Sequence, residues 1–254
     1  KHLFTKMGKY NFDKIIDRRG TGSMMTDCLT KVFGRNDLSP LWIADMDFEV
    51  CPAISQAIEK RAEHHIYGYS QAPDSYWESI IGWIKRRHNW DVTREEITYV
   101  NGVVRGYAYA LNFFTKPGDT IVIQQPVYHP FRNVAVGNHR RIVSNDLIKN
   151  GDCYSMDLSG LEHIFATENP KLMVVCNPHN PIGICWDKES LIEVARLAKK
   201  YNVIIVSDEI HCDLGIFGHK HTPFASVSED AAAVSISFGA PSKTFNIPGV
   251  SSSW

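Results

Sequence analysis

Continuous apolar runs that alternate with helix-length segments are the feature that most constrains the fold of this 254-residue chain. The runs Leu172–Cys176 and Val203–Ser207 are almost entirely apolar, which is typical of β-strands covered on both faces. The segment between them, about Lys188–Tyr201, has the length and apolar spacing of a helix. Strands and helices that alternate in this way predict an α/β fold with a mostly parallel central sheet flanked by helices.

Further segments extend the same alternation. We expect helices at about Pro52–His64, after Pro73 and at Gly102–Phe114, and strands at Ile97–Val100, Thr120–Gln124 and near Ala233–Ser237. In the helix after Pro73, the residues Trp77, Ile80, Ile81 and Ile84 recur at helical spacing. We therefore predict that this stripe belongs to a hydrophobic core.

The composition argues against several classes of function. The formal net charge is -1, so we expect no nucleic-acid partner. No apolar run approaches the roughly 18 residues that a membrane span needs, and Lys1–Lys9 lacks the apolar core of a signal peptide. We predict a cytoplasmic protein without a membrane partner.

Metal binding is not indicated either. The six cysteines are scattered without a CxxC pair, and we expect them to be reduced thiols. Two histidine groups attract notice, namely His64–His65 and the set His211, His219 and His221. No Cys or carboxylate completes a known ligand spacing around them, so we predict no metal site.

Polar side chains stand where the predicted strands end. Asn180 lies in a loop with two Asn-Pro steps, Asp208 follows a buried apolar strand, and Lys243 follows the last strand among small and polar residues. Ligands of such sheets bind beyond the carboxyl ends of the strands. An amine for a Schiff base, a carboxylate for a protonated pyridine nitrogen and an amide for a phenolate oxygen are parts that a pyridoxal-phosphate (PLP) site requires.

Two further strand ends carry weaker signals. The turn Asn101–Val104 opens a helix, and the free N–H groups of a helix start bind phosphate. Tyr128 places an aromatic ring near another strand end, but by itself this position indicates an ordinary core or surface tyrosine.

Five motifs carry a resemblance to a known family: Trp42–Phe48, Tyr67–Tyr69, Asn177–Gly183, Ser207–His211 and Pro241–Asn246. From about residue 10 to residue 254, the sequence resembles fold-type I PLP-dependent enzymes of the class I/II aminotransferase superfamily. Within it, the sequence is most similar to the MalY/PatB-type cystathionine β-lyase (C–S lyase) branch.

The resemblance implies an aspartate-aminotransferase-like large domain and a role for each site residue. The implied roles are Lys243 as Schiff-base lysine and proton shuttle, Asp208 at the pyridine nitrogen, Asn180 and His211 near the phenolic oxygen, Tyr128 stacked on the ring, the backbone of Val103 and Val104 with the Ser242 hydroxyl at the phosphate, and Tyr69 at the phosphate of the neighbouring subunit. The role of Tyr69 implies a homodimer.

The sequence also departs from the family pattern. Ser251 stands where the superfamily often has a phosphate-binding arginine, Arg105 where a small residue or proline is usual, and Ile184 where relatives often have arginine. Family members continue into a small C-terminal domain, which we expect to be missing here. We assign residues 1–50 to an N-terminal segment, comprising an arm and part of the small domain, and residues 51–254 to the PLP-binding large domain.

The function implied for the parent enzyme is α,β-elimination of small amino-acid substrates, cystathionine or cysteine, to a thiol, pyruvate and ammonia. Two alternatives remain open. A PLP-dependent aminotransferase uses the same lysine, aspartate and asparagine, and a truncated PLP-binding or regulatory protein needs no turnover. The activity of this chain by itself is therefore left open. A dinucleotide-binding dehydrogenase is disfavoured because no GxGxxG motif follows a strand.

Overall fold

The computed structural model describes residues 10–254. Residues 1–9, on which the expectation about a signal peptide rests, lie outside the described part. The chain divides into two compact units. One contains the chain up to Ser70 together with Phe245–Val250, and the other contains Gln71–Thr244 with Ser251–Trp254. The functional domain boundary at residue 50 stays a prediction.

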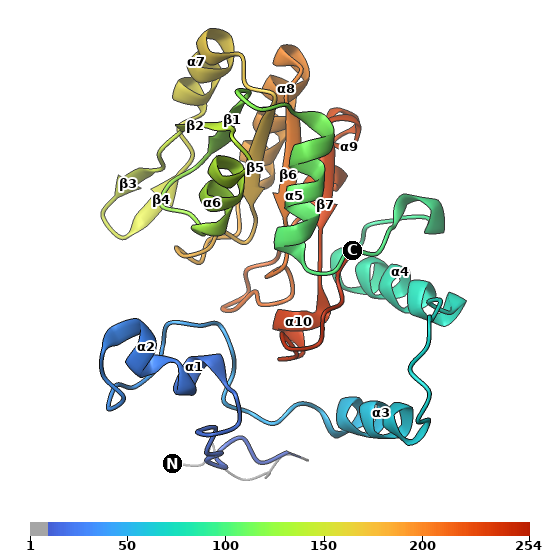
Figure 1. The fold of residues 1–254 in the computed structure, drawn as a ribbon. Helices are drawn as coiled ribbons and strands as arrows, with labels where there is room; N and C mark the ends of the chain where they lie inside the picture. The colour runs from blue at the N-terminus through green and yellow to red at the C-terminus, as the bar shows by residue number, and fades with distance from the viewer. Residues whose placement is uncertain (1–9) are drawn as a thin grey trace, which may run out of the picture. The chain divides into compact units, whose positions relative to one another are not determined.

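A parallel β-sheet forms the centre of the larger unit (Figure 1). It has five strands in the order β2-β1-β5-β6-β7, and every neighbouring pair runs parallel. The strands are β1 (Thr120–Ile123), β2 (Arg141–Ser144), β5 (Leu172–Cys176), β6 (Ile204–Asp208) and β7 (Ser235–Phe238). The predicted α/β fold with a mostly parallel sheet is confirmed.

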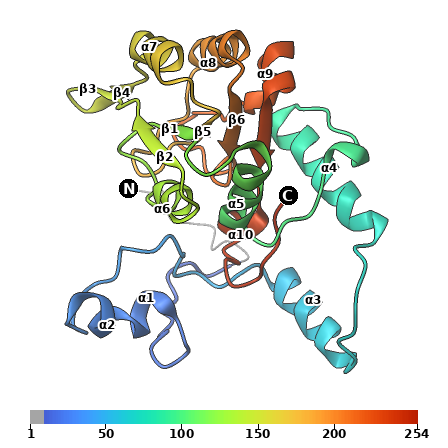
Figure 2. The same cartoon turned by 45° about the horizontal axis from the view of Figure 1, so that its top comes forward.

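Helices cover both faces of this sheet, and alternate strand residues pack against each layer (Figure 2). On one face, Ile121 and Ile123 share a core with α5 (Val103–Phe114) and α6 (Pro130–Gly137). On the other face, Val122 shares a core with residues of three further helices. Those helices are α7 (Leu158–Glu168), α8 (Lys188–Tyr201) and α9 (Glu229–Val234). A strand covered on both faces must be apolar at every position, which explains the continuous runs.

The larger unit also contains a small antiparallel hairpin and two single-turn elements. They are β3 (Ile148–Asn150), which pairs with β4 (Cys153–Ser155), η2 (Phe224–Ser226) and the short helix α10 (Pro241–Thr244). The hairpin is exposed and lies beside the main sheet. The helix α10 follows β7 and carries Lys243.

The structure differs from one strand prediction. Residues 97–100 form no strand; a 3-10 turn, η1 (Arg94–Glu96), precedes them, and Val100 makes a single bridge with Ser253. The Glu96 carboxylate accepts the backbone N–H of Thr93 at 2.7 Å and closes the turn. The local side chain therefore determines the backbone here rather than the β-propensity of the apolar residues that follow.

The helix α4 (Asp74–His88) carries the predicted apolar stripe. Trp77, Ile80 and Ile84 are buried in a cluster of their own, against which the half-buried Ile81 packs. The prediction of a core stripe is confirmed. Among the described residues, no helix combines the length and apolar character needed to cross a bilayer.

In its described residues, from Tyr10 onward, the smaller unit has three helices and few buried side chains. They are α1 (Met24–Asp27), α2 (Leu29–Phe33) and α3 (Pro52–Glu63), and α3 buries none of its residues. Asn246 holds the loop 46–48: its amide accepts the N–H of Met46 at 2.9 Å and donates to the carbonyls of Met46 and Phe48 at 3.0 Å. Two motifs that carry the family resemblance are thus structural partners.

Candidate cofactor site

The register of the sheet places three strand ends in one row. Cys176 at the end of β5 pairs with Asp208 at the end of β6, and Asp208 pairs with Phe238 at the end of β7. The loop that contains Asn180 and the segment that contains Lys243 leave the sheet from the two outer members of this row. The structure therefore brings the predicted amide, carboxylate and amine to the same edge of the sheet.

Asp208 lies at the centre of this row and is buried, with 5% of its surface exposed. Burial raises the pKa of its carboxyl from 3.8 to about 6, and the neighbouring Glu209 adds to the rise. The N–H of Ile210 donates to Oδ1 at 3.1 Å. This hydrogen bond and the charge of Lys243 both act to lower the pKa of Asp208. A carboxylate that is costly to ionise in the free protein is well suited to bind a cationic ring nitrogen.

Lys243 is half-buried on α10 and lies close enough to two predicted site residues to affect their ionisation. Its charge favours the ionised form of Asp208. The pKa of His211 is lowered, first by burial and then by the positive charge of Lys243. The amine of Lys243 is thus near enough to both Asp208 and His211 for its charge to act on them; its predicted role stays a prediction.

The Asn180 loop is fixed by contacts that the sequence did not reveal. The ring of His179 bonds through Nε2 to the carbonyl of Pro126 at 2.9 Å, and the backbone N–H of Asn180 donates to Cys176 Sγ at 3.4 Å. His179 thereby joins this loop to the segment before Tyr128. Its position between two Asn-Pro steps was the available signal, but a buried histidine cannot be assigned a partner from sequence.

Tyr128 is half-buried on the same edge of the sheet. The pKa of its phenol is raised by burial and by the charge of Asp208, which places the ring near the carboxylate. Its ring also meets the ring of Phe131 edge-on, with centroids 5.6 Å apart. The position is consistent with the predicted stacking role, which remains a prediction.

The start of α5 provides a second group of polar contacts. Gly102 caps the helix with φ +95°, a backbone conformation that L side chains rarely adopt. The N–H of Gly102 donates to Ser253 Oγ at 2.8 Å. Val103 and Val104 form the first turn of α5, and the N–H groups of a first turn have no intrahelical partner. Ser242 lies half-buried on α10. These features suit a phosphate group.

Tyr69 belongs to the smaller unit and is fully exposed. Its predicted contact with a neighbouring subunit therefore remains a prediction.

Sequence reasoning missed a second polar layer behind the row. Glu209 accepts bonds from His221 at 3.0 Å, from the N–H of Phe224 at 2.9 Å and from the hydroxyls of Ser207 and Ser237. The adjacent acidic pair Asp208–Glu209 was the available signal, but the sequence alone did not show that the two side chains have different partners.

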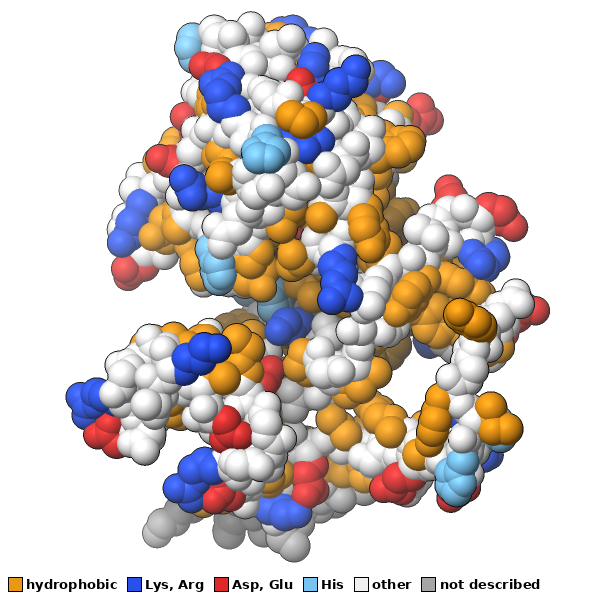
Figure 3. Space-filling view, viewed as in Figure 1, with side chains coloured by type: hydrophobic (Ala, Val, Ile, Leu, Met, Phe, Trp, Pro, Cys, Tyr) orange, Lys and Arg blue, Asp and Glu red, His pale blue; other side chains and the backbone are white. Residues whose placement is uncertain are grey.

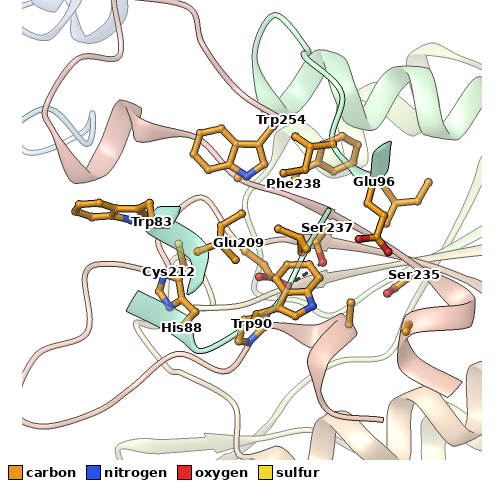
Figure 4. A pocket seen from close by; sticks show the side chains of 18 of the residues that line it. Trp83, His88, Trp90, Glu96, Glu209, Cys212, Ser235, Ser237, Phe238 and Trp254 are labelled. Carbon is orange, nitrogen blue, oxygen red and sulfur yellow. Dashed lines mark hydrogen bonds between the residues drawn. The ribbon is translucent and has the colours of Figure 1, made fainter. Parts of the chain in front are cut away.

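A cavity of about 400 Å³ lies beside β7 and is lined by Trp83, Trp90, Glu209 and Trp254, among others (Figure 4). None of the predicted cofactor residues is among those that line it. The residue row at the strand ends, which combines a buried carboxylate with an amine, is therefore the better candidate for chemistry.

Comparison with known proteins identifies the family. The profile described as "Aminotransferase class I and II" matches residues 37–251. The chain belongs to the class I and II aminotransferase family. Cystathionine beta-lyase PatB from Bacillus subtilis is 43% identical over 96% of this chain and 63% of its own length. Protein MalY from Escherichia coli is 31% identical over 96% and 62%, respectively.

Comparison with solved structures supports the same family assignment. A PLP-bound putative aminotransferase from Clostridium difficile superposes with a TM-score of 0.93 at 43% identity and covers 96% of this chain and 63% of its own. A PLP-bound C–S lyase from Staphylococcus hominis gives 0.89 at 33% identity and covers 96% and 62%. The predicted resemblance to the MalY/PatB-type branch is confirmed. The chain spans about 63% of the length of PatB.

Proposed function

We propose that the chain is the cofactor-binding part of a PLP-dependent carbon–sulfur β-lyase, which converts cystathionine- or cysteine-type amino acids to a thiol, pyruvate and ammonia. The observation that carries the proposal is the buried Asp208 carboxylate with the Lys243 amine beside it at the strand ends. The preference for a lyase rests on the relatives named cystathionine beta-lyase, which cover nearly the whole chain.

The residues present fit PLP. Asp208 would supply the anion for the pyridine nitrogen: burial raises the pKa of its carboxyl, and a cationic partner would offset the cost of its ionisation. Asn180 and His211 supply donors for the phenolic oxygen, and Tyr128 supplies a ring face. The first turn of α5, with Ser242, supplies donors for the phosphate. When bound, PLP withdraws electrons from Cα of the substrate and so makes its proton acidic.

The protein's own groups carry out the remaining steps. With the cofactor in place, Lys243 would hold its aldehyde carbon through the side-chain amine, and that amine, once freed by the substrate amine, would accept the Cα proton of the substrate. Asp208 keeps its negative charge against a protonated ring nitrogen, which preserves the electron-withdrawing form. The sulfur substituent would leave Cβ and take up a proton to give the thiol, and reaction of the remaining unsaturated amine with water would give pyruvate and ammonia.

We also propose that the whole protein is a cytoplasmic homodimer. A dimer would give the exposed Tyr69 a phosphate to bind in the neighbouring subunit. Tyr109 and Phe113 on α5 and Val136 on α6 are exposed. Figure 3 shows apolar side chains at the surface in the region of these helices, which supports a face that a second copy covers. The six free thiols support a reducing compartment.

The experiment uses the whole protein and compares wild type, Lys243→Ala and Lys116→Ala, which removes an exposed lysine in a turn. The proteins are loaded with PLP and supplied with cystathionine. We expect pyruvate from wild type and Lys116→Ala, and neither pyruvate nor the visible absorbance of lysine-bound PLP from Lys243→Ala. Pyruvate release by Lys243→Ala contradicts the assignment.

The same assay separates the alternatives. Pyruvate release without added keto acid identifies a lyase, whereas amino-group transfer that depends on a keto acid identifies an aminotransferase. If wild type binds PLP through Lys243 but shows neither pyruvate release nor amino-group transfer, the result supports a binding or regulatory role.

A further inference from the structure

The carboxylate of Asp213 accepts hydrogen bonds from side chains in separate parts of the larger unit. Oδ2 accepts bonds from Trp83 Nε1 and Thr244 Oγ1, both at 2.9 Å, and Oδ1 accepts one from His88 Nε2 at 2.9 Å. Arg87 Nε approaches Oδ1 at 3.7 Å. The Asp213 side chain is only 6% exposed. Both oxygens are therefore engaged in a largely dry environment.

The donors come from two helices that are far apart in the sequence, α4 and α10. Trp83 and His88 belong to α4, and Figure 4 shows them beside Cys212 at one side of the cavity. Thr244 is the last residue of α10 and follows Lys243 directly. Through Asp213, the helix α4 and the loop after β6 thus hold the segment that presents the lysine.

The charge state of Asp213 supports this role. Burial acts to raise the pKa of the carboxyl, but hydrogen bonds from His88, Trp83 and Thr244 outweigh it and hold the pKa below its usual value. The group is therefore an anion at neutral pH, and hydrogen bonds to an anion are about twice as strong as neutral ones.

A metal site at the same place fits the observations less well. Ligand atoms of His88, Cys212 and Asp213 lie within 4.8 Å of one another. However, burial and the charge of Asp213 raise the pKa of the Cys212 thiol, which makes the thiolate that a metal would need harder to form. The carboxylate oxygens that a metal would need already accept the three hydrogen bonds.

We propose that Asp213 is a positioning residue for Lys243. Its carboxylate anchors α10 through Thr244, so that the lysine amine is held toward the cofactor aldehyde. The inference rests on the proposed role of Lys243. The step at issue is the addition of the amine to the aldehyde carbon: a C=N bond forms and one water molecule leaves. Because reactive geometry is sensitive to displacements of about 1 Å, loss of the anchor slows this step more than it weakens cofactor binding.

The test uses the cofactor-free protein mixed with PLP. Attachment is followed by visible absorbance and by borohydride trapping with mass mapping of the Lys243 peptide, and reversible binding is followed by fluorescence. We expect Asp213→Asn and Thr244→Val to slow attachment on the order of ten-fold, with PLP affinity changed less than about three-fold. Thr244→Ser keeps the hydroxyl and retains the wild-type rate.

Asp91→Asn is the matched control, because Asp91 forms an exposed ion pair with Lys85 and such pairs contribute little. If Thr244→Val attaches PLP at the wild-type rate, or if Thr244→Ser is as slow as Thr244→Val, the positioning role is wrong. Trapping at a lysine other than Lys243 in wild type instead refutes the proposed function. Thr244→Val removes a single hydroxyl and keeps the test interpretable where Asp213→Asn fails to fold.

Discussion

Asp208 and Glu209 are neighbours in the chain, and both lie in the protein interior with 5% of their surface exposed. Their carboxyl groups nevertheless differ. Burial raises the pKa of Asp208 to about 6. The pKa of Glu209 is lowered, because the charge and hydrogen bond of His221 and further donors outweigh the effect of burial. Equal burial thus leads to opposite shifts.

The difference lies in the donors that the protein provides. Glu209 accepts bonds from His221, Phe224, Ser207 and Ser237, whereas Asp208 accepts the N–H of Ile210 and lies within the field of Lys243. A buried anion with a complete set of donors stabilises the fold, while one with an incomplete set retains the capacity to bind a cation. We infer that Glu209 is structural and Asp208 functional.

Replacement of Glu209 tests the structural half of this comparison and has the largest expected effect. Glu209→Leu leaves four donors, one of them the buried His221, without their acceptor, so we expect the free energy of unfolding to fall by about 3–5 kcal/mol. Urea unfolding of the cofactor-free protein measures the change.

Glu193→Leu is the control for this variant. Glu193 pairs with Arg196 on the surface of α8 at 2.7 Å, and such pairs are worth less than about 1 kcal/mol. If Glu209→Leu is no more destabilising than Glu193→Leu, the contacts of Glu209 are not what holds the strand ends together.

The pH dependence of stability tests the functional half. The pKa of Asp208 is about 6 in the folded protein and 3.8 when unperturbed, so the folded state binds the proton more tightly than the unfolded state. Its ionisation therefore destabilises the fold: the effect is absent below pH 3.8, grows between pH 3.8 and 6, and is complete above pH 6. Its full size is about 3 kcal/mol.

Asp208→Asn removes this ionisation. In the cofactor-free protein, we expect the variant to be more stable than wild type by up to about 3 kcal/mol at pH 7, with the difference shrinking toward pH 4. Unfolding of both proteins over this range gives the difference directly, and contributions from other groups cancel. A variant less stable than wild type at pH 7 shows that Asp208, like Glu209, is a structural anion.

Much of the fold was predictable from the sequence, because strands covered on both faces leave apolar runs that few other structures produce. The helix α8 was predicted with its observed bounds. The prediction failed at residues 97–100, where the Glu96 side chain closes a turn. The region from α6 to α7 was not assigned, because its strand β2 is only partly buried and lacks the continuous apolar pattern.

The candidate site was predictable to a similar extent. Parallel strands bring their carboxyl ends to one edge, so Asn180, Asp208 and Lys243 could be grouped before any coordinates were known. The hydrogen-bonded partners of Glu209 and Asp213 could not, since these contacts join residues distant in sequence such as Asp213 and His88. Register and packing determine such contacts, and neither is encoded in a local pattern.

Ser237 offers the smallest and most specific test of the comparison between the two carboxylates. Its hydroxyl donates to Glu209 Oε1 at 3.1 Å from the neighbouring strand β7. Ser237→Ala removes one of several donors while His221 stays in place, so we expect a loss of about 1 kcal/mol in the free energy of unfolding. Ser79→Ala is the control, because its exposed hydroxyl bonds only within α4, to the carbonyl of Ser75, and we expect a change below about 0.5 kcal/mol. In the double variant Ser237→Ala/Glu209→Leu, the serine contributes nothing further, since its acceptor is gone. Additive losses in that double variant would mean that Ser237 stabilises the protein by packing rather than through Glu209.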